Sequence, residues 1–196
     1  MKIYVAILHT GWVKSELAFK LIKWLRESKY DIHYEFSNLS PIAHNRNTIV
    51  QKFLLSDCDY LLQIDNDNIP VKNPLDLIQY KKDIISCPVW IYQHKKVLNV
   101  YKYDDNDEYL IPLDPKGYNN KGLIEVDATG SGILICSRKV LEAIKAPFER
   151  KFDENGIETR GLDLYFCDKA IEKGFKIFTH MDYIAQHYKI IDLTIL

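Results

Sequence analysis

The segment LLQIDNDNIP (residues 61–70) joins a mostly apolar run to two aspartates that flank one asparagine. The apolar run is typical of a buried strand, and carboxylates two residues apart in an extended chain point to the same side. Asp65 and Asp67 would therefore repel each other unless a cation lies between them. Oxygen ligands favour Mg²⁺ or Mn²⁺, and a capped turn is the alternative. An EF-hand loop is excluded, because Pro70 stands where that loop needs glycine.

The first 65 residues alternate between strand and helix patterns. Residues 2–8, 31–36 and 59–65 are strand-like runs, whereas residues 13–28 and 45–57 place apolar side chains at helical spacing. This βαβαβ order predicts a parallel sheet with right-handed crossovers, in which ligands bind beyond the carboxyl ends of the strands. The aspartate pair lies at one such end.

The second half also mixes helices and strands. The expected helices are residues 74–81, 137–146 and 162–174, and the expected strands are residues 83–90, 97–103, 108–112, 123–128, 132–137 and 175–180. The charged segment 147–161 is expected to be a loop, either a mobile substrate loop or a plain solvated connection. The pattern predicts one α/β domain.

Composition narrows the class of protein. The chain has 196 residues, of which 47% are hydrophobic, enough for one core. Its 26 Lys and Arg against 27 Asp and Glu give a net charge of -1, which does not support nucleic-acid binding. The four cysteines lack zinc-ligand spacing and are scattered, which favours a reducing, cytoplasmic setting. The N-terminal apolar run is too short to span a membrane, so no transmembrane segment is expected, and peripheral membrane association stays open.

Five further residues have structural interpretations that compete with a functional one. Arg46 stands in or just before the first turn of an expected helix, where it would either meet a phosphate or face solvent. Gly130 and Gly132 precede a strand and would either admit a ligand or form a tight turn. Asp163 begins a helix and is open to a capping role. A lone late histidine such as His187 usually packs or faces solvent.

The order of these motifs resembles the glycosyltransferases of the GT-A fold, especially their inverting, family-2-like branch. The resemblance rests on residues 45–70, 126–142 and 161–178 with the late histidine, and it spans about Lys2 to His187. The short chain also resembles the minimal glycosyltransferases encoded by some archaeal viruses, which would place it in a host cytoplasm. The implied fold is one Rossmann-like domain over residues 1–196 with a mixed, mainly parallel sheet flanked by helices.

The resemblance also implies a reaction. A sugar would pass from a nucleoside-diphosphate sugar to a hydroxyl of an unknown glycan, protein or lipid acceptor, with inversion. Residues 1–90 would form the nucleotide-binding half and residues 91–196 the acceptor-binding half. No nucleic-acid partner is implied.

Individual roles follow from the same resemblance. Asp65 would contact the donor's ribose or bridge to a metal, and the expected ligands of Mn²⁺ or Mg²⁺ are Asp65, Asp67 and His187. Asp163 would be the general base. The residues expected to border the donor nucleotide are His9, Thr10, Gly11, Arg46, Asp65, Asn66 and Asp67, and those expected near the donor sugar or acceptor are Gly130, Ser131 and Gly132.

Two positions depart from the family pattern. Leu162 stands where the family often has a glutamate before the catalytic aspartate, which affects acceptor recognition. The end of the second strand offers Glu35, Ser37 and Asn38 in place of an aspartate that reads the base, so the nucleotide is not named.

Three other classes remain as alternatives. A nucleotidyltransferase would show a glycine-rich phosphate loop after the first strand, where this chain has one glycine. A glycosidase would use two carboxylates that flank the sugar bond, and this mechanism does not explain Arg46 or a late histidine. A non-catalytic sugar-nucleotide-binding protein would keep the fold and tolerate loss of Asp163.

Overall fold

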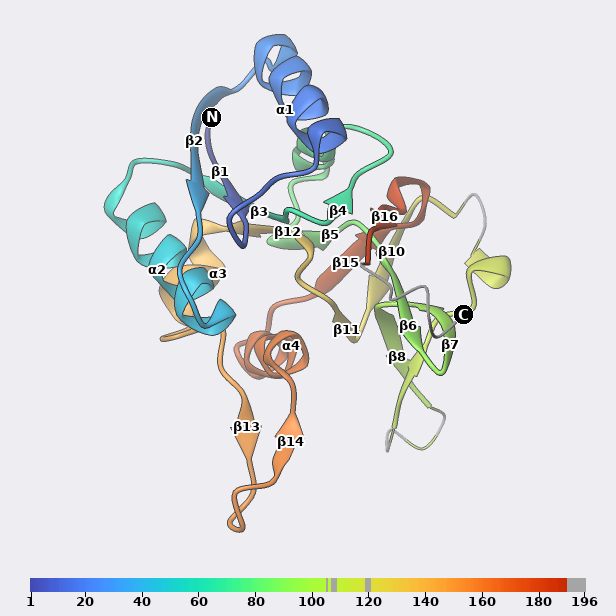
Figure 1. The fold of residues 1–196 in the computed structure, drawn as a ribbon. Helices are drawn as coiled ribbons and strands as arrows, with labels where there is room; N and C mark the ends of the chain where they lie inside the picture. Colours follow the sequence, from blue (N-terminus) through green and yellow to red (C-terminus); the bar gives the residue numbers. More distant parts are fainter. Residues whose placement is uncertain (105, 107–108, 119–120, 190–196) are drawn as a thin grey trace.

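A mixed seven-stranded sheet forms the centre of the molecule (Figure 1). The computed structural model describes residues 1–104, 106, 109–118 and 121–189. The sheet has the order β10–β15–β5–β12–β3–β1–β2. Its strands are β1 (Lys2–Leu8), β2 (Asp31–Ser37), β3 (Tyr60–Asp65), β5 (Ile84–Ser86), β10 (Leu123–Val126), β12 (Ile133–Ser137) and β15 (Ile177–His180).

Five of these strands share one direction, whereas β12 and β10 run antiparallel to their neighbours. The expected α/β class, with a mixed and mainly parallel sheet, is confirmed. Because β3 and β1 are parallel neighbours, their carboxyl ends meet at one edge of the sheet. Asp65, which ends β3, and Asp67, which follows it, therefore lie beside the loop that follows β1.

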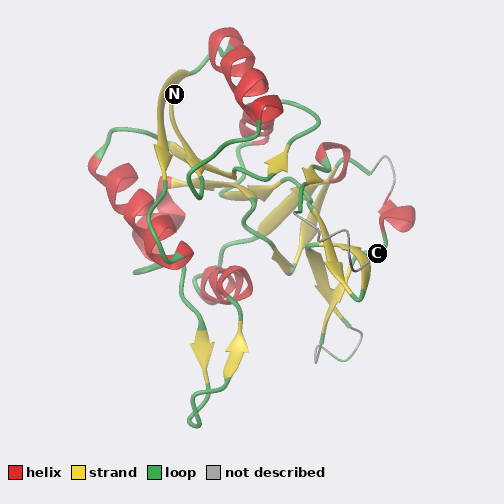
Figure 2. Cartoon of the chain, viewed as in Figure 1, coloured by secondary structure: helices red, strands yellow, loops and turns green. Residues whose placement is uncertain are grey.

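Helices cover both faces of this sheet (Figure 2). The helices are α1 (Ser15–Glu27), α2 (Ile42–Leu55), α3 (Arg138–Ala143) and α4 (Leu162–Glu172), with 3₁₀ turns η1 (Pro74–Tyr80), η2 (Pro115–Tyr118) and η3 (Met181–Tyr183). Alternate side chains of β1 enter two cores, one shared with α1 and the other with α2, α3 and α4. Each fully buried large apolar side chain, such as Phe53 of α2, contributes about 1.5 to 3 kcal/mol to folding.

Short strands surround the main sheet. They are β4 (Asn68–Ile69), β6 (Trp90–Gln93), β7 (Lys95–Leu98), β8 (Val100–Tyr103), β9 (Leu110–Pro112), β11 (Ala128–Thr129), β13 (Lys151–Phe152), β14 (Glu158–Arg160) and β16 (Gln186–His187). The strands β11, β8 and β9 form a second sheet, and β16 pairs with β4. The hairpin of β13 and β14 projects away from the body of the molecule (Figure 1).

Several expected elements differ in detail. The expected strand 83–90 ends at Ser86 and resumes as β6, because Cys87 and Pro88 lie between two separate pairings. The expected strand 97–103 is interrupted at Asn99, and residues 107 and 108, at the start of the strand expected over 108–112, lie outside the described residues. The segment 147–161 was expected to be a loop, but it contains the β13–β14 hairpin.

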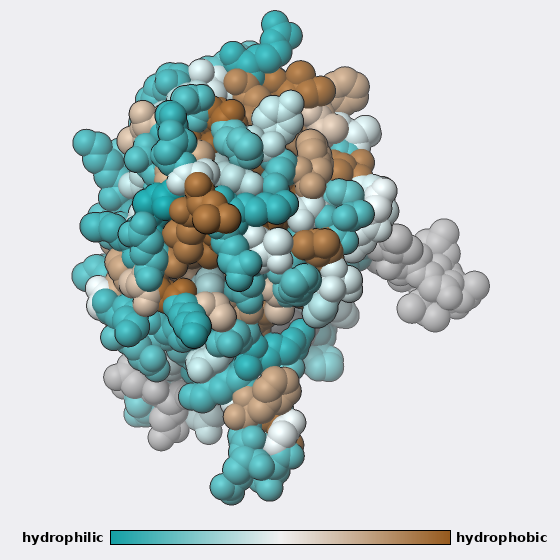
Figure 3. All heavy atoms as spheres, turned by 90° about the vertical axis from the view of Figure 1, so that its left-hand side faces the viewer, coloured by the Kyte–Doolittle hydropathy of each residue, from teal (hydrophilic) through white to brown (hydrophobic). Residues whose placement is uncertain are grey.

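Exposed apolar side chains are dispersed over the surface. Figure 3 shows the face that lies on the left of Figure 1, where hydrophobic patches are separated by hydrophilic side chains. Phe19 and Leu55, for example, are exposed on α1 and α2, which cover opposite faces of the sheet. In the part of the chain that the structure describes, no helix is long and apolar enough to cross a membrane.

Candidate functional site

A first pocket of about 590 Å³ opens where β1 and β3 end. It is lined by Leu8, His9, Thr10, Gly11, Asn38, Leu39, Ser40, Ile42, Asn45, Asp65, Asn66 and Asp67. The structure thus brings together six of the seven residues expected to border a nucleotide. The seventh, Arg46, lies in an adjoining pocket.

That second pocket has a volume of about 420 Å³. Its lining is Ile42, Arg46, Asp65, Ile91, Asn99, Tyr101, Gly130, Arg150, Gly161, Leu162, Asp163 and Leu164. Asp65 and Ile42 line both pockets, so the two cavities adjoin at Asp65. The expected base, Asp163, therefore faces a different cavity from Asp67, with Asp65 at the border.

Arg46 is not placed as the sequence suggested. Because α2 begins at Ile42, Arg46 lies in the second turn, and its side chain is only 3% exposed. Neither the solvent-facing position nor a position in the first turn is found. The error came from starting the helix at Asn45, three residues too late.

The guanidinium of Arg46 instead binds the aspartate at the border of the pockets. Its Nη2 donates to both Asp65 oxygens, at 2.8 and 2.9 Å, and its Nη1 donates to Gln63 Oε1 at 3.2 Å. Its Nε is buried and has no hydrogen-bond partner among the described residues, which costs free energy. The guanidinium of Arg46 therefore compensates part of the repulsion between Asp65 and Asp67.

Asp65 lies in a conflicting electrostatic environment. Burial raises the pKa of its carboxyl group to about 6, and the nearby charges of Asp163 and Asp67 act in the same direction. The Arg46 guanidinium opposes them and favours the carboxylate. The protonation of Asp65 is thus sensitive to any further charge that enters either pocket.

Asp67 meets a residue from the far end of the chain. The pairing of β16 with β4 places His187 opposite Asn68, and His187 Nε2 then lies 3.2 Å from Asp67 Oδ2. The other ring nitrogen, Nδ1, lies 2.8 Å from the carbonyl oxygen of Trp90. A carbonyl only accepts, so Nδ1 carries the hydrogen, and Nε2 faces the carboxylate either protonated or as a bare lone pair.

This pair has the chemistry of a metal-ligand pair. The hydrogen bond to Asp67 raises the pKa of His187, because the carboxylate stabilises a proton held between the two groups. A divalent cation fits the same donors in place of that proton, and the Trp90 carbonyl fixes the ring as outer partners of metal ligands do. Mg²⁺ commonly takes one or two protein ligands and completes its shell with phosphates and water.

The expected three-residue metal site is not confirmed. Within the described ranges, no group of three His, Cys, Asp or Glu side chains is placed to hold a metal. Asp65 accepts from Arg46 through both oxygens, which leaves Asp67 and His187 as the available donors.

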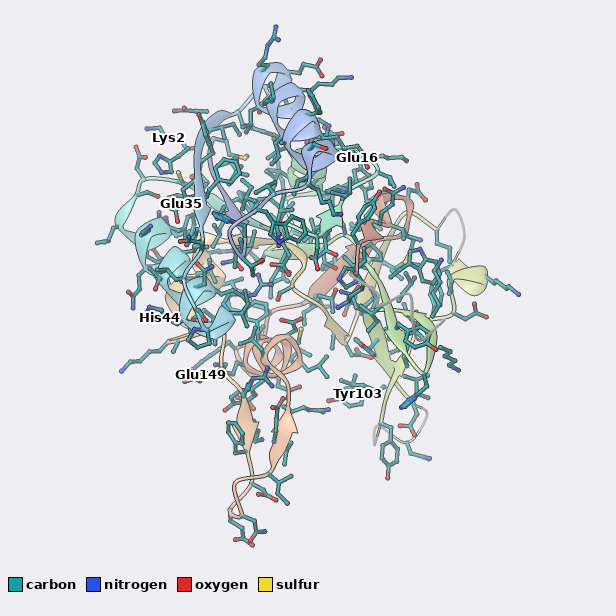
Figure 4. All side chains as sticks on the ribbon, in the orientation of Figure 1. Lys2, Glu16, Glu35, His44, Tyr103 and Glu149 are labelled. Atoms are coloured by element: carbon teal, nitrogen blue, oxygen red, sulfur yellow. The ribbon has the colours of Figure 1, made fainter. Side chains whose placement is uncertain are left out.

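Backbone and side-chain hydrogen bonds hold the C-terminal segment next to the aspartate motif. Tyr188 N donates to Asp67 O at 2.9 Å, and the Tyr188 hydroxyl donates to Glu16 at 3.2 Å, at the start of α1 (Figure 4). The middle residue of the motif, Asn66, donates to Trp12 O at 2.9 Å. The loop after β1 and the C-terminal segment are thus both tied to the aspartate motif.

The polar residues at the end of β2 have three different environments. Asn38 lines the first pocket. Ser37 hydrogen-bonds Asn45, and Glu35 pairs with Lys52 of α2 at 3.0 Å (Figure 4). Asn38 is therefore the member of this group that is placed to meet a ligand.

The glycines that flank Ser131 are needed for packing against the protein itself. A Cβ at Gly130 would lie 2.1 Å from Asn99 Nδ2, and a Cβ at Gly132 would lie 2.6 Å from Asn68 Nδ2. Gly130 nevertheless lines the second pocket, and Gly132 O accepts a hydrogen bond of 2.8 Å from Asp65 N. The turn thus joins Asp65 to the second pocket.

Asp163 does not cap its helix. The N-cap of α4 is Gly161, and no side chain caps that end. Asp163 Oδ1 instead accepts a short hydrogen bond from Ser131 Oγ. No Lys, Arg or His of the described chain forms an ion pair with it, so its second oxygen is free to act on a ligand. Leu162, where the family pattern has a carboxylate, lines the same pocket.

Sequence reasoning missed several residues of the site. Asn99 lines the second pocket and holds the neighbouring backbone, since its Oδ1 accepts from Val89 N at 2.7 Å. Gln63 is buried beside Arg46. Both are single polar residues inside apolar strand patterns, and that exception to the pattern was an available signal.

No protein-family model and no curated protein matches the sequence. The fold matches solved structures. A197 from STIV has a TM-score of 0.64 at 21% identity, over 97% of this chain and 87% of that chain. GalNAc-T7, solved with UDP, GalNAc and Mn²⁺, has a TM-score of 0.52 at 11% identity, over 97% of this chain and 43% of that one.

The chain has a GT-A-like fold. A third structure, UDP-glucose pyrophosphorylase complexed with UDP-glucose, has a TM-score of 0.46 at 13% identity, over 95% of this chain and 74% of that chain. The fold rests on the first two structures, and their identities of 21% and 11% describe the fold alone. The two pockets of this chain adjoin at Asp65, at the carboxyl end of β3. Open α/β sheets bind ligands at the carboxyl ends of their parallel strands.

Proposed function

We propose that this protein is a glycosyltransferase that takes a sugar from a nucleoside-diphosphate sugar, with the help of a divalent cation. The observation that carries the proposal is the pair of adjoining pockets that share Asp65. Asp67 lines the first pocket and pairs with His187, and Asp163 of the second pocket has no cationic partner in the part of the chain that the structure describes. Such a transfer needs a leaving-group site and a base at neighbouring positions.

In this proposal, the first pocket binds the nucleoside diphosphate. The loop after β1, at His9, Thr10 and Gly11, borders the nucleoside together with Asn38. Asp65, held by Arg46, accepts a hydrogen bond from the ribose. The diphosphate lies toward Asp67 and His187. The solved GalNAc-T7 structure contains UDP and Mn²⁺, which supports this choice of ligands.

Asp67 and His187 would hold Mn²⁺ or Mg²⁺. When bound, the cation neutralises charge on the departing diphosphate. His187 takes part only after losing its Nε2 proton, so nucleotide binding is coupled to that deprotonation.

The second pocket binds the acceptor, which is a glycan, protein or lipid hydroxyl. Asp163 accepts the proton of that hydroxyl, because one of its oxygens is held by Ser131 and the other is unpaired. A base on the acceptor side of the sugar gives inversion. Leu162 replaces a carboxylate in this pocket, so acceptor hydroxyls have Asp163 and Arg150 as charged neighbours.

A thermal-shift screen tests the donor half of the proposal. UDP, GDP, CDP and ADP are each added with Mn²⁺, with Mg²⁺ or with EDTA. A ligand that binds the native state raises the melting temperature, and we expect at least one diphosphate to do so only with a divalent cation. Pyrophosphate release from a nucleoside triphosphate and a sugar phosphate would instead indicate a nucleotidyltransferase.

A further inference from the structure

Ser131 is the residue that holds the unpaired carboxylate of the second pocket. Its side chain is buried, with 1% exposed, and its Oγ donates to Asp163 Oδ1. A serine hydroxyl has one proton to donate, so Ser131 can bind one Asp163 oxygen and no more. The other oxygen is left for a ligand.

The turn that carries Ser131 is fixed on both sides. Gly130 N donates to Asn99 O at 2.7 Å, and Gly132 O accepts from Asp65 N at 2.8 Å. Gly130 and Gly132 pack closely against the side chains of Asn99 and Asn68, with no space for a Cβ at either position. Ser131 is therefore held at a set position between the donor-side aspartate and α4.

We propose that Ser131 is a positioning residue for the base Asp163, and that the turn of residues 130–132 sets the distance between donor and base. This inference rests on the proposed function. In the step it serves, the acceptor oxygen bonds to the anomeric carbon and loses its proton to the free Asp163 oxygen. The bond from that carbon to the diphosphate oxygen breaks, and the nucleoside diphosphate leaves with the electron pair.

The chain contains a matched pair of the same chemistry outside the pockets. Ser137 Oγ donates to Asp83 Oδ1 at 2.7 Å, and Ser137 is also buried. Asp83 differs in having Lys139 at 3.8 Å, and neither Ser137 nor Asp83 lines either pocket. Ser137→Ala therefore removes a buried serine–aspartate hydrogen bond without touching the site.

The experiment compares Ser131→Ala with Ser137→Ala in a donor-dependent transfer or hydrolysis assay, with melting curves for both. Ser131→Ala is expected to lower kcat by about tenfold or more while the donor KM changes less than about twofold, because a misplaced base acts after binding. Ser137→Ala is expected to leave kcat near normal at a similar loss of melting temperature. In an Asp163→Asn background, Ser131→Ala is expected to cause no further loss of kcat.

Three results would overturn the inference. If folded Ser131→Ala has a normal kcat while Asp163→Asn has a low kcat, Ser131 is not a positioning residue, and the proposed function is unaffected. Equal losses of kcat in Ser131→Ala and Ser137→Ala would assign both bonds to general stability. If Ser131→Ala does not fold, Ser131→Cys, which keeps the size and a weak donor, is measured against the same predictions. Normal turnover of Asp163→Asn itself would instead overturn the base and the inference together.

Discussion

The two pockets hold their aspartates in opposite ways. At the border of the pockets, Asp65 accepts from a buried guanidinium through both oxygens. In the second pocket, Asp163 accepts one hydroxyl hydrogen bond and has no ion-pair partner within the described chain. The same residue type is thus bound by a buried guanidinium in one place and by a single hydroxyl in the other. The environment of each carboxylate, more than its identity, assigns its role.

Removal of the unpaired carboxylate should have the largest effect. Asp163→Asn keeps the size of the side chain but cannot take a proton, so turnover should fall by roughly 10²- to 10⁴-fold while nucleotide binding survives. Steady-state rates and a binding titration measure the two effects. Asp168→Asn is the control, because Asp168 also lies on α4 but pairs with Arg160 at 3.1 Å. Equal losses in both variants would contradict the contrast between the two aspartates.

Breaking the paired carboxylate should act on stability before turnover. Arg46→Met removes the guanidinium that donates to Asp65 and Gln63. The free energy of unfolding should fall by about 2 to 4 kcal/mol. This loss is smaller than for a fully buried ion pair, because the Asp65 side chain is 25% exposed. Urea unfolding gives this value. The pair of Lys52 and Glu35 provides the control, since the Lys52 side chain is half exposed and Lys52→Met should change stability by less than about 1 kcal/mol. A similar small change for Arg46→Met would show that the pair is not structural.

Removal of the divalent cation should weaken the first pocket alone. EDTA should lower nucleoside-diphosphate affinity, because the cation that neutralises the diphosphate charge is removed, and His187→Gln should abolish the response to Mn²⁺. Calorimetric titration with and without Mn²⁺ measures this difference. His33→Gln changes an exposed histidine on β2 and should keep the response. If chelation does not change the nucleoside-diphosphate affinity, Asp67 and His187 form a hydrogen bond but do not bind a metal.

The smallest expected effect is a pH dependence of stability. The folded-state pKa of His187 is raised by Asp67, so its contribution to stability is complete below the unfolded value of about 6.5 and is lost as pH rises through the folded value. The stability difference between wild type and His187→Gln, measured by urea unfolding, should therefore shrink from pH 6 to higher pH. A difference that stays constant or grows over this range would contradict the proton shared with Asp67.

Local sequence patterns predicted the helices and strands of the molecule better than they predicted the surroundings of its site residues. The strand and helix periods of residues 2–65 gave β1, α1, β2 and β3 closely, because burial on a sheet and along one helix face repeats in the sequence. The strand β12 was predicted over residues 132–137, but its antiparallel position between β5 and β3 was not, since direction and neighbours depend on long-range connections.

Predictions for the site depended on contacts between distant residues. Asp67 and His187 are 120 residues apart, and Ser131 and Asp163 are 32 apart. Their contacts arise only when the sheets have formed, so spacing alone does not show them. The role of Arg46 as a partner of Asp65 was missed for the same reason, because it depends on how α2 packs on β3. The resemblance suggested the residues, and the structure supplied their partners.

The most direct test of the central claim is the release of nucleoside diphosphate from sugar nucleotides. Purified protein is incubated with Mn²⁺ and a panel of UDP-, GDP-, CDP- and ADP-sugars, and the released diphosphate is measured for wild type and Asp163→Asn. We predict release from at least one donor by wild type, its loss on addition of EDTA, and a much slower rate for Asp163→Asn. No release from any donor, together with diphosphate binding that is indifferent to Mn²⁺, would contradict a metal-dependent glycosyltransferase.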